Sequence, residues 1–235
     1  MTAGTPSAAP QATAQRLRIL CLHGYTQNAN VFRSRLAVMR KDLKNIAVFG
    51  EFVSAPHVVP KEEIPPVASA ASVDLNAPVD EMGPRTWWRP FTLPSKLEDS
   101  IAEVTEIWSK ASPPFDGILG FSQGATMAAL VLPSLDPPPR FSIHCSGFFP
   151  HDPAHGAMLA ALPTVPSLHV MGRSDAWVPP ARSEALRAMF KDPQTMVHDG
   201  GHFIPTNATH RRTYKEFVGQ FTNSAPLDSG EAETQ

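Results

Sequence analysis

Short apolar runs alternate along the chain with segments in which apolar residues recur at helical spacing. The runs are typical of buried β-strands and lie at 17–22, 46–53, 115–121, 141–145, 167–172 and 195–198. Helical spacing is found at 29–44, 97–108, 125–132, 180–190 and 207–221. Strands and helices that alternate in this way predict an α/β fold, with a mostly parallel central sheet covered by helices on both faces.

One long stretch, residues 55–94, shows no clear period and is rich in proline. We therefore expect an irregular excursion that ends near Trp87 and Trp88, and loops of this length are often functional. Ser95 and Glu98 form a capping-box pattern, which predicts the start of the next helix. The connection after Phe149 is short, which indicates only a minimal lid.

Length and composition predict a single domain. The chain has 235 residues and is 42% apolar, enough for one substantial core, which we place over residues 16–223. Residues 1–15 and the acidic stretch 224–235 lack core-forming side chains and are predicted to be disordered tails. Residues 1–15 also lack the order of a secretion signal, and no apolar run reaches membrane-spanning length. These features predict a soluble cytoplasmic protein.

Charge and cysteine content exclude several classes of function. The 20 basic and 22 acidic residues give a net charge of −2, which provides no electrostatic footprint for nucleic acid or an anionic membrane. Cys21 and Cys145 lie inside predicted buried strands, so no disulfide is indicated. His151 and His155 are spaced to share a metal, but no further ligands accompany them, and we predict no metal or cofactor.

The pentapeptide Gly120-Phe121-Ser122-Gln123-Gly124 lies between a predicted strand and a predicted helix. This context indicates a nucleophile elbow, a sharp turn that lifts a serine hydroxyl clear of the sheet. The serine is held in a strained conformation, and the residues two before and two after it must lack bulk. Alone the pattern is weak, but a suitable acid and histidine follow it in order.

A serine hydroxyl needs a neighbouring base, which in turn needs an acid to orient it. Asp175 directly follows the strand at 167–172, at the sheet edge where such sites form, so we predict that it is the acid in preference to Asp199. His202 lies in a glycine-rich loop between the last strand and the last helix, and we predict that it is the base. His198 is its rival, whereas His144 and His169 lie inside predicted strands.

Catalysis by such a serine also needs donors for the oxyanion of the tetrahedral intermediate. The usual donors are the amide after the nucleophile and one from the loop after an early strand, which here are the backbone N–H groups of Gln123 and Tyr25. His23-Gly24 allows a tight turn before Tyr25. The alternative interpretation is an ordinary turn at the end of a strand.

These residues resemble the FSH-type serine hydrolases of the α/β-hydrolase superfamily, which include fungal esterases and hydrolases or thioesterases of polyketide gene clusters. The resemblance covers roughly residues 17–222 and is carried by residues 23–28, the elbow, and the stretches at 83–89, 172–179 and 201–205. It implies an α/β-hydrolase fold, a Ser122–His202–Asp175 triad, and Tyr25 and Gln123 as oxyanion donors. Carboxylesterases and acyl-protein thioesterases share the elbow, but usually have a Gly-Asp element where this chain has Thr26-Gln27-Asn28.

The predicted reaction is hydrolysis of an acyl ester or thioester through an acyl-enzyme. Aromatic residues in loops near the predicted site are candidates for an apolar acyl pocket or, alternatively, for core that anchors those loops. They are Trp87, Trp88, Phe91, Phe148, Phe149 and Trp177. The resemblance suggests release of a product from an acyl carrier domain of a polyketide synthase. A general short-chain carboxylesterase is the alternative, and a hydrolase-shaped binding module without catalytic activity is a more remote one.

Overall fold

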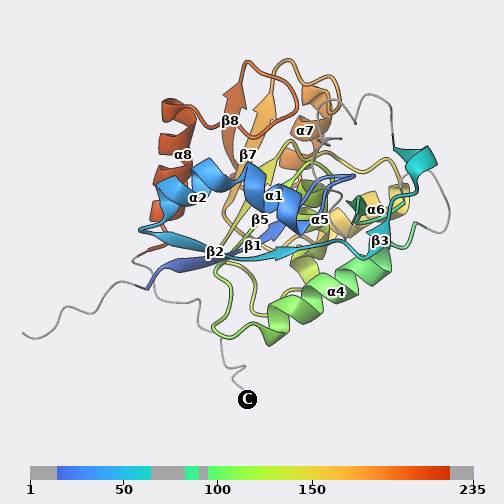
Figure 1. Cartoon of the computed structure of the whole chain (residues 1–235), viewed down its shortest axis with the longest axis horizontal. Helices are drawn as coiled ribbons and strands as arrows, with labels where there is room; N and C mark the ends of the chain where they lie inside the picture. Colours follow the sequence, from blue (N-terminus) through green and yellow to red (C-terminus); the bar gives the residue numbers. More distant parts are fainter. Residues whose placement is uncertain (1–14, 65–82, 90–94, 223–235) are drawn as a thin grey trace, which may run out of the picture.

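The computed structural model describes residues 15–64, 83–89 and 95–222 (Figure 1). The two predicted tails, 1–15 and 224–235, lie outside the described residues except for Gln15. So does Phe91, one of the predicted pocket residues.

Six parallel strands form the central sheet in the order β2-β1-β5-β6-β7-β8. They are β1 (Leu17–Leu22), β2 (Ala47–Val53), β5 (Gly117–Phe121), β6 (Phe141–Cys145), β7 (Ser167–Gly172) and β8 (Gln194–His198). All six correspond to the predicted apolar runs. Because the strands are parallel, their carboxyl ends share one edge of the sheet, and the loops that leave this edge can form a site.

Helices cover both faces of the sheet, as predicted (Figure 1). The helices are α1 (Ala29–Arg35), α2 (Ala37–Leu43), α4 (Leu97–Lys110), α5 (Gln123–Val131), α6 (Pro153–Met158), α7 (Pro180–Arg187) and α8 (Ala208–Gly219). Short 3₁₀ turns occur at η1 (Lys61–Glu63), η2 (Leu132–Ser134) and η3 (Leu159–Ala161). A small antiparallel pair, β3 (His57–Val58) with β4 (Arg85–Thr86), lies within the predicted excursion.

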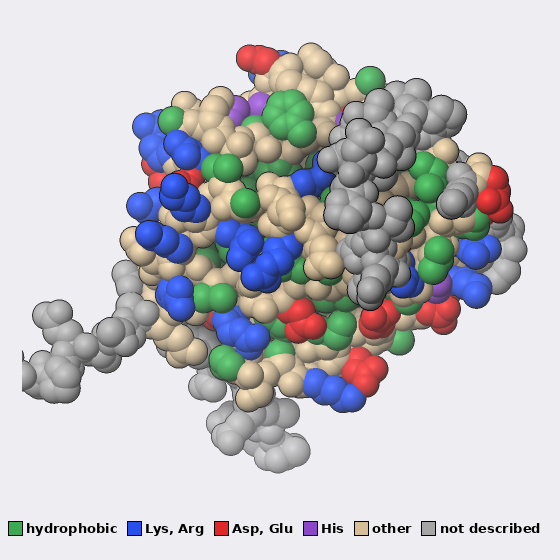
Figure 2. All heavy atoms as spheres, viewed as in Figure 1, with side chains coloured by type: hydrophobic (Ala, Val, Ile, Leu, Met, Phe, Trp, Pro, Cys, Tyr) green, Lys and Arg blue, Asp and Glu red, His purple; other side chains and the backbone are tan. Residues whose placement is uncertain are grey.

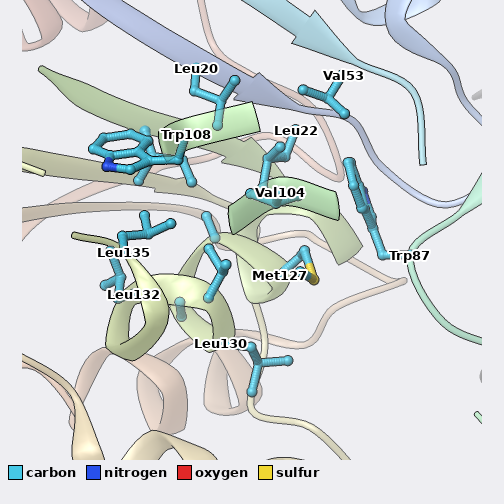
Figure 3. Close-up of a cluster of buried hydrophobic side chains, with 14 of the residues drawn as sticks. Leu20, Leu22, Val53, Trp87, Val104, Trp108, Met127, Leu130, Leu132 and Leu135 are labelled. Carbon is cyan, nitrogen blue, oxygen red and sulfur yellow. The ribbon is translucent and has the colours of Figure 1, made fainter. Parts of the chain in front are cut away.

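Successive side chains along a strand point to opposite faces of the sheet and pack into two separate cores. Leu20 and Leu22 of β1 pack with α4 and α5 in one cluster, which is drawn in Figure 3. Ile19 and Cys21 point to the other face and join α1, α2 and α8. Both faces of the sheet are therefore buried, and full burial of a leucine side chain contributes about 2 kcal/mol.

Two helix predictions were wrong in detail. The helix expected over 29–44 is interrupted at Leu36, whose ψ of 7° ends α1 and starts α2. Leu36 is fully buried and belongs to the same core cluster as Phe32 and Met39 on either side of it. The expected capping box at Ser95 is absent, because Lys96, in a left-handed conformation, precedes α4. The Ser95 hydroxyl instead lies 3.1 Å from His155 Nε2.

The predicted inert cysteines are buried in the sheet. Cys21 and Cys145 are free thiols with no exposed surface, and burial raises the pKa of Cys145 to about 12. Within the described ranges, no helix has the length and apolar character needed to cross a lipid bilayer.

Two histidines lie inside the core next to each other. His144 on β6 and His169 on β7 stack with ring centroids 4.8 Å apart. The two nitrogens of His144 each lie 2.9 Å from a partner, Nδ1 from Ala125 O and Nε2 from Ser142 Oγ. Burial lowers the pKa of His144 to about 4 and that of His169 well below its usual value. Both rings are therefore neutral in the folded protein at neutral pH.

Because these buried histidines resist protonation, we expect the protein to lose stability in acid. An unfolded histidine takes up a proton near pH 6.5, whereas folded His144 does so only near pH 4. His144 therefore does not lower the stability above pH 6.5. As the pH falls from there toward 4, the unfolded state binds a proton that the folded state does not, and the free energy of unfolding falls by roughly 3 kcal/mol. Urea unfolding at about pH 7.5 and pH 4.5 measures this loss. The loss should be smaller in His144→Gln, whose amide does not titrate; an equal loss in both proteins would contradict the assignment.

Candidate active site

Ser122 lies at the sharp turn between β5 and α5, at the carboxyl edge of the sheet. Its φ of 54° and ψ of −120° put a non-glycine residue in a strained conformation. Its backbone N–H donates to Cys145 O on the neighbouring strand over 2.8 Å, which helps to hold the turn. The predicted elbow geometry is therefore present.

The two glycines of the elbow are required by close backbone contacts. A Cβ built on Gly120 would lie 2.2 Å from Gly124 O, and one built on Gly124 would lie 2.3 Å from His23 O. No side chain fits at such distances, because the obstructing atoms belong to the backbone. The pattern found in the sequence thus has a direct steric cause.

Asp175 follows β7 and is held in one orientation by three atoms of its surroundings. Its Oδ1 accepts hydrogen bonds from the amides of Trp177 at 2.9 Å and Val178 at 2.8 Å, and its Oδ2 lies 2.7 Å from His202 Nδ1. Burial alone would raise the pKa of this carboxyl. The hydrogen bonds from His202 and the two amides outweigh burial and hold the pKa below its usual value, so Asp175 is a carboxylate at neutral pH.

His202, in the loop between β8 and α8, connects Asp175 to Ser122. Its Nε2 lies 2.9 Å from Ser122 Oγ, while its ring packs against Phe121 with centroids 4.9 Å apart. The carboxylate of Asp175 can only accept, so Nδ1 carries the proton and Nε2 is free to accept from the serine hydroxyl. This tautomer suits a general base.

The rival residues lie elsewhere. His198 is buried against Phe203 and His210, and within the described part of the chain neither of its ring nitrogens has a hydrogen-bond partner. Burial lowers the pKa of His198. Asp199 is exposed and pairs with Arg173 at 3.3 Å. The structure therefore brings His202 and Asp175 to the serine, and not these alternatives.

The two predicted oxyanion donors flank the serine. Gln123 is the first residue of α5, and the loop that carries Tyr25 touches the elbow, since a Cβ built on Gly24 would lie 3.3 Å from Ser122 Cβ. Gly24 O is held by Gln27 N at 3.1 Å and by His23 Nδ1 at 2.8 Å, which turns the Tyr25 N–H away from those groups. Within the described residues, neither donor amide is occupied by another acceptor.

Sequence reasoning missed two buried polar side chains at the site. His23 is neutral, since burial lowers its pKa to about 4, and its Nε2 accepts from Ala55 N at 2.9 Å. The side chain of Gln123 bonds to the Thr86–Trp88 segment, whereas the sequence motif predicts a role only for its backbone. The motif could not reveal this contact, because its partners lie 35–37 residues upstream in a segment without periodicity.

The aromatic residues proposed as pocket lining fall into different environments. Trp87 is fully buried, and its Nε1 donates to His23 O at 2.8 Å, so the alternative interpretation of loop-anchoring core applies to it. Trp88 is nearly buried and packs edge-on against the half-buried Phe148. Phe149 is half-buried and Trp177 is 42% exposed.

His151 and His155, the pair considered for a metal, do not form a metal cluster. His155 contacts Ser95 and Asp152 instead. Among the described residues, no group of three or more potential ligands is arranged to hold a metal ion.

The arrangement as a whole defines a class of protein. A parallel sheet with a serine at the turn after β5, an acid after β7 and a histidine after β8 is an α/β-hydrolase. Comparison with known proteins gives the family: the model of the serine hydrolase family FSH1 matches residues 12–214. The chain belongs to this family. The predictions of an α/β-hydrolase fold and of a serine hydrolase are therefore confirmed.

Curated relatives support this assignment over nearly the whole chain. Esterase OVCA2 of Danio rerio is 36% identical over 229 residues, which cover 89% of this chain and 99% of the relative. Esterase OVCA2 of Homo sapiens is 37% identical over 229 residues, with coverage of 88% and 98%. Esterase CG5412 of Drosophila melanogaster is 34% identical over 221 residues, with coverage of 86% and 74%.

Solved structures share the fold at low sequence identity. SOBER1 of Arabidopsis thaliana has a TM-score of 0.62 at 18% identity, over 88% of this chain and 99% of that chain. A carboxylesterase of Bacillus cereus has a TM-score of 0.59 at 16% identity, over 89% of this chain and 92% of that chain. The agreement extends to the mostly parallel sheet and its flanking helices.

The steric role of the elbow glycines predicts that Gly120→Ala will not fold to a stable state. The added methyl overlaps backbone atoms of α5, and we expect a loss of more than about 3 kcal/mol in the free energy of unfolding. Gly219→Ala at the end of α8 is the control, because nothing lies within 4 Å of the added atom and alanine favours helix. Thermal melts of the two variants should diverge; equal melting temperatures would contradict the steric argument.

Proposed function

We propose that Ser122, His202 and Asp175 catalyse hydrolysis of an acyl ester through a covalent acyl-enzyme. The observation that carries this proposal is the continuous relay of hydrogen bonds, 2.9 Å from Ser122 Oγ to His202 Nε2 and 2.7 Å from His202 Nδ1 to Asp175 Oδ2. Family membership supports it independently, because the family consists of serine hydrolases.

In the first half-reaction, Ser122 Oγ attacks the acyl carbonyl carbon while His202 Nε2 takes the hydroxyl proton. His202 then gives this proton to the leaving oxygen as the bond to the acyl carbon breaks. In the second half-reaction, water loses a proton to His202 and attacks the acyl carbon. The bond from that carbon to Ser122 Oγ then breaks, Oγ takes the proton back from His202, and the carboxylic acid leaves. Asp175 stays ionised throughout and stabilises the positively charged imidazole.

Both tetrahedral intermediates carry a negative oxygen next to Ser122. The unoccupied amides of Tyr25 and Gln123 are suited to donate to it, and removal of one such donor typically lowers the rate by about 10²- to 10³-fold. Gln123 N also lies at the amino end of α5, where the helix dipole favours negative charge.

For the natural substrate we propose an acyl ester or thioester, with a fungal polyketide intermediate held by an acyl carrier domain as the finer possibility. The family resemblance supports the finer proposal. The charge distribution adds to it, since Lys and Arg gather over α1, α2 and α8 in Figure 2 despite the net charge of −2. The basic side chains on these helices are Arg33, Arg35, Arg40, Lys41, Arg211, Arg212 and Lys215. Two of them are already paired on this face, Arg211 with Asp42 and Arg212 with Glu216, and the remaining excess of positive charge favours an acidic partner.

The cytoplasmic location stays a prediction.

Three alternatives are kept for comparison. A general short-chain carboxylesterase and an acyl-protein-thioesterase-like enzyme would use the same relay on other acyl groups. A binding module without catalytic activity would not need a hydroxyl, an imidazole and an ionised carboxylate in line. A fluorophosphonate probe separates this last alternative, because only an activated Ser122 reacts with it.

Replacing Ser122 by Ala should lower kcat on a p-nitrophenyl acyl ester by at least about 10³-fold while the fold is kept. Asp175→Asn should lower it by roughly 10²- to 10⁴-fold, because the amide no longer fixes the tautomer of His202. Ser174→Ala is the control, since this exposed hydroxyl bonds to Asp199 O and, among the described residues, to no other group. Full activity of Ser122→Ala would show that the nucleophile is misassigned.

Rates on matched substrates separate the finer possibilities. An enzyme that releases polyketides should have a higher kcat/KM on an acyl pantetheine thioester than on the oxygen ester of the same acyl group, beyond their intrinsic reactivity in buffer. A general carboxylesterase should show no such preference. A preference for the oxygen ester would count against the carrier-domain proposal.

A further inference from the structure

The two proposed oxyanion donors lie beyond the reach of the strand pairing. β1 and β5 are paired as far as Leu22 and Gly120, and Tyr25 and Gln123 each lie three residues further along the chain. The sheet therefore does not by itself fix the distance or the angle between the two amides. Because a donor acts only when it is aimed at the developing charge, some other structure must hold them.

The segment of residues 83–89 is bonded to the loop that carries Tyr25. Thr26 N donates to Arg85 O over 3.0 Å, and Arg85 N donates to Gln27 O over 2.8 Å. Asn28 Nδ2 adds a bond of 3.1 Å to Gly83 O. These contacts form a short backbone ladder immediately after Tyr25.

Thr26 indicates that this ladder bears strain. Its φ of 63° is unfavourable for a β-branched residue and persists only where the surroundings over-determine it. The bond from Thr26 N to Arg85 O and the bond from Thr26 Oγ1 to Tyr25 O hold it there, the latter over 2.6 Å.

The same segment is bonded to the elbow through the side chain of Gln123. Its Oε1 accepts from Trp87 N at 3.1 Å, and its Nε2 donates to Trp88 O at 3.0 Å. The Thr86 hydroxyl lies 3.0 Å from the same Oε1. In this orientation the amide bonds to both Trp87 N and Trp88 O, and Trp88 O also accepts from the Thr86 hydroxyl. Gln123, Thr86 and Trp88 are at most 5% exposed. Water could therefore not replace these hydrogen bonds if the Gln123 side chain were removed.

Trp87 links residues 83–89 to His23 as well. Its Nε1 donates to His23 O, and its ring packs on the His23 ring with centroids 5.1 Å apart. His23 in turn holds Gly24 O, which orients the peptide that carries the Tyr25 N–H. One segment thus contacts both sides of the proposed oxyanion site.

We propose that residues 83–89 form a clamp that fixes the amides of Tyr25 and Gln123 relative to each other, with the Gln123 side chain as the positioning residue that ties the clamp to the elbow. This inference rests on the proposed function and deepens it. Neither the Gln123 side chain nor the clamp touches the reacting atoms; both act through the two backbone donors. A clamp of this kind stabilises the transition state more than the bound substrate.

Two variants test the clamp, and a third is matched to them. Gln123→Met keeps the backbone donor but removes the bonds to Trp87 N and Trp88 O. Trp87→Phe removes the bond to His23 O. Trp108→Phe is the control. Trp108 belongs to the same core cluster and also donates from its Nε1 to a backbone oxygen, Pro137 O, but it lies across the cluster from Trp87 (Figure 3).

We expect Gln123→Met to lower kcat on p-nitrophenyl acetate by roughly 10- to 100-fold with KM within about twofold, and Trp87→Phe to lower it by roughly 3- to 10-fold. Affinity for phenylboronic acid, which forms a tetrahedral adduct with an active serine, should fall in parallel. Trp108→Phe should change kcat by less than about twofold. Urea unfolding of each variant checks that it is folded under the assay conditions, so that the rates compare folded proteins. If Gln123→Met does not fold, Trp87→Phe decides alone.

Two negative outcomes are distinguishable. If the wild-type protein hydrolyses the ester in a Ser122-dependent way but the folded clamp variants keep its kcat and boronate affinity, as Trp108→Phe does, the clamp is overturned and the proposed function stands. If the wild type shows no Ser122-dependent turnover, the proposed function is overturned and the role of the clamp with it.

Discussion

The contact between the backbones of β5 and α5 at the elbow is the constraint around which the rest of the site is arranged. Gly120 and Gly124 let the chain reverse within a few residues, and this reversal forces Ser122 into its strained conformation. It also buries the start of α5 beneath the loop after β1, where Gly124 touches the backbone of Leu22 and His23. This steric contact thus positions the serine and brings the loop after β1 against the elbow, while the hydrogen bonds of the clamp hold the two proposed donors relative to each other.

Polar groups around this turn are satisfied in a selective way. The carboxylate oxygens of Asp175, the ring nitrogens of His23 and the side-chain amide of Gln123 all have partners. The backbone N–H groups of Tyr25 and Gln123, in contrast, have no acceptor within the described residues. Unpaired polar groups in a buried site are costly, and they are stabilised when a negative oxygen arrives. In the proposed mechanism, the two unpaired amides therefore gain their acceptor only when the negative oxygen forms in the transition state.

Much of the architecture could be predicted from the sequence because it follows from local patterns. Apolar runs gave the six strands, and their alternation with helices gave the parallel sheet. The proposed triad residues could be brought together from the sequence because each lies in the connection that follows a strand of the parallel sheet. The interruption at Leu36 and the missing capping box at Ser95 could not, since both depend on tertiary contacts that override local preference. The same holds for Trp87 and the side chain of Gln123, whose partners are distant in sequence.

The order of the site along the chain has a consequence for biosynthesis. The loop with Tyr25 leaves the ribosome early, and the clamp and the elbow follow. His202 emerges only after all six strands of the sheet have been made, with α8 still to come. Contacts of such long range form late, because closing large loops is entropically slow. On the proposed assignment, a nascent chain therefore has no base beside its serine until the segment after β8 has been made. Activity is for this reason a stringent reporter of complete folding.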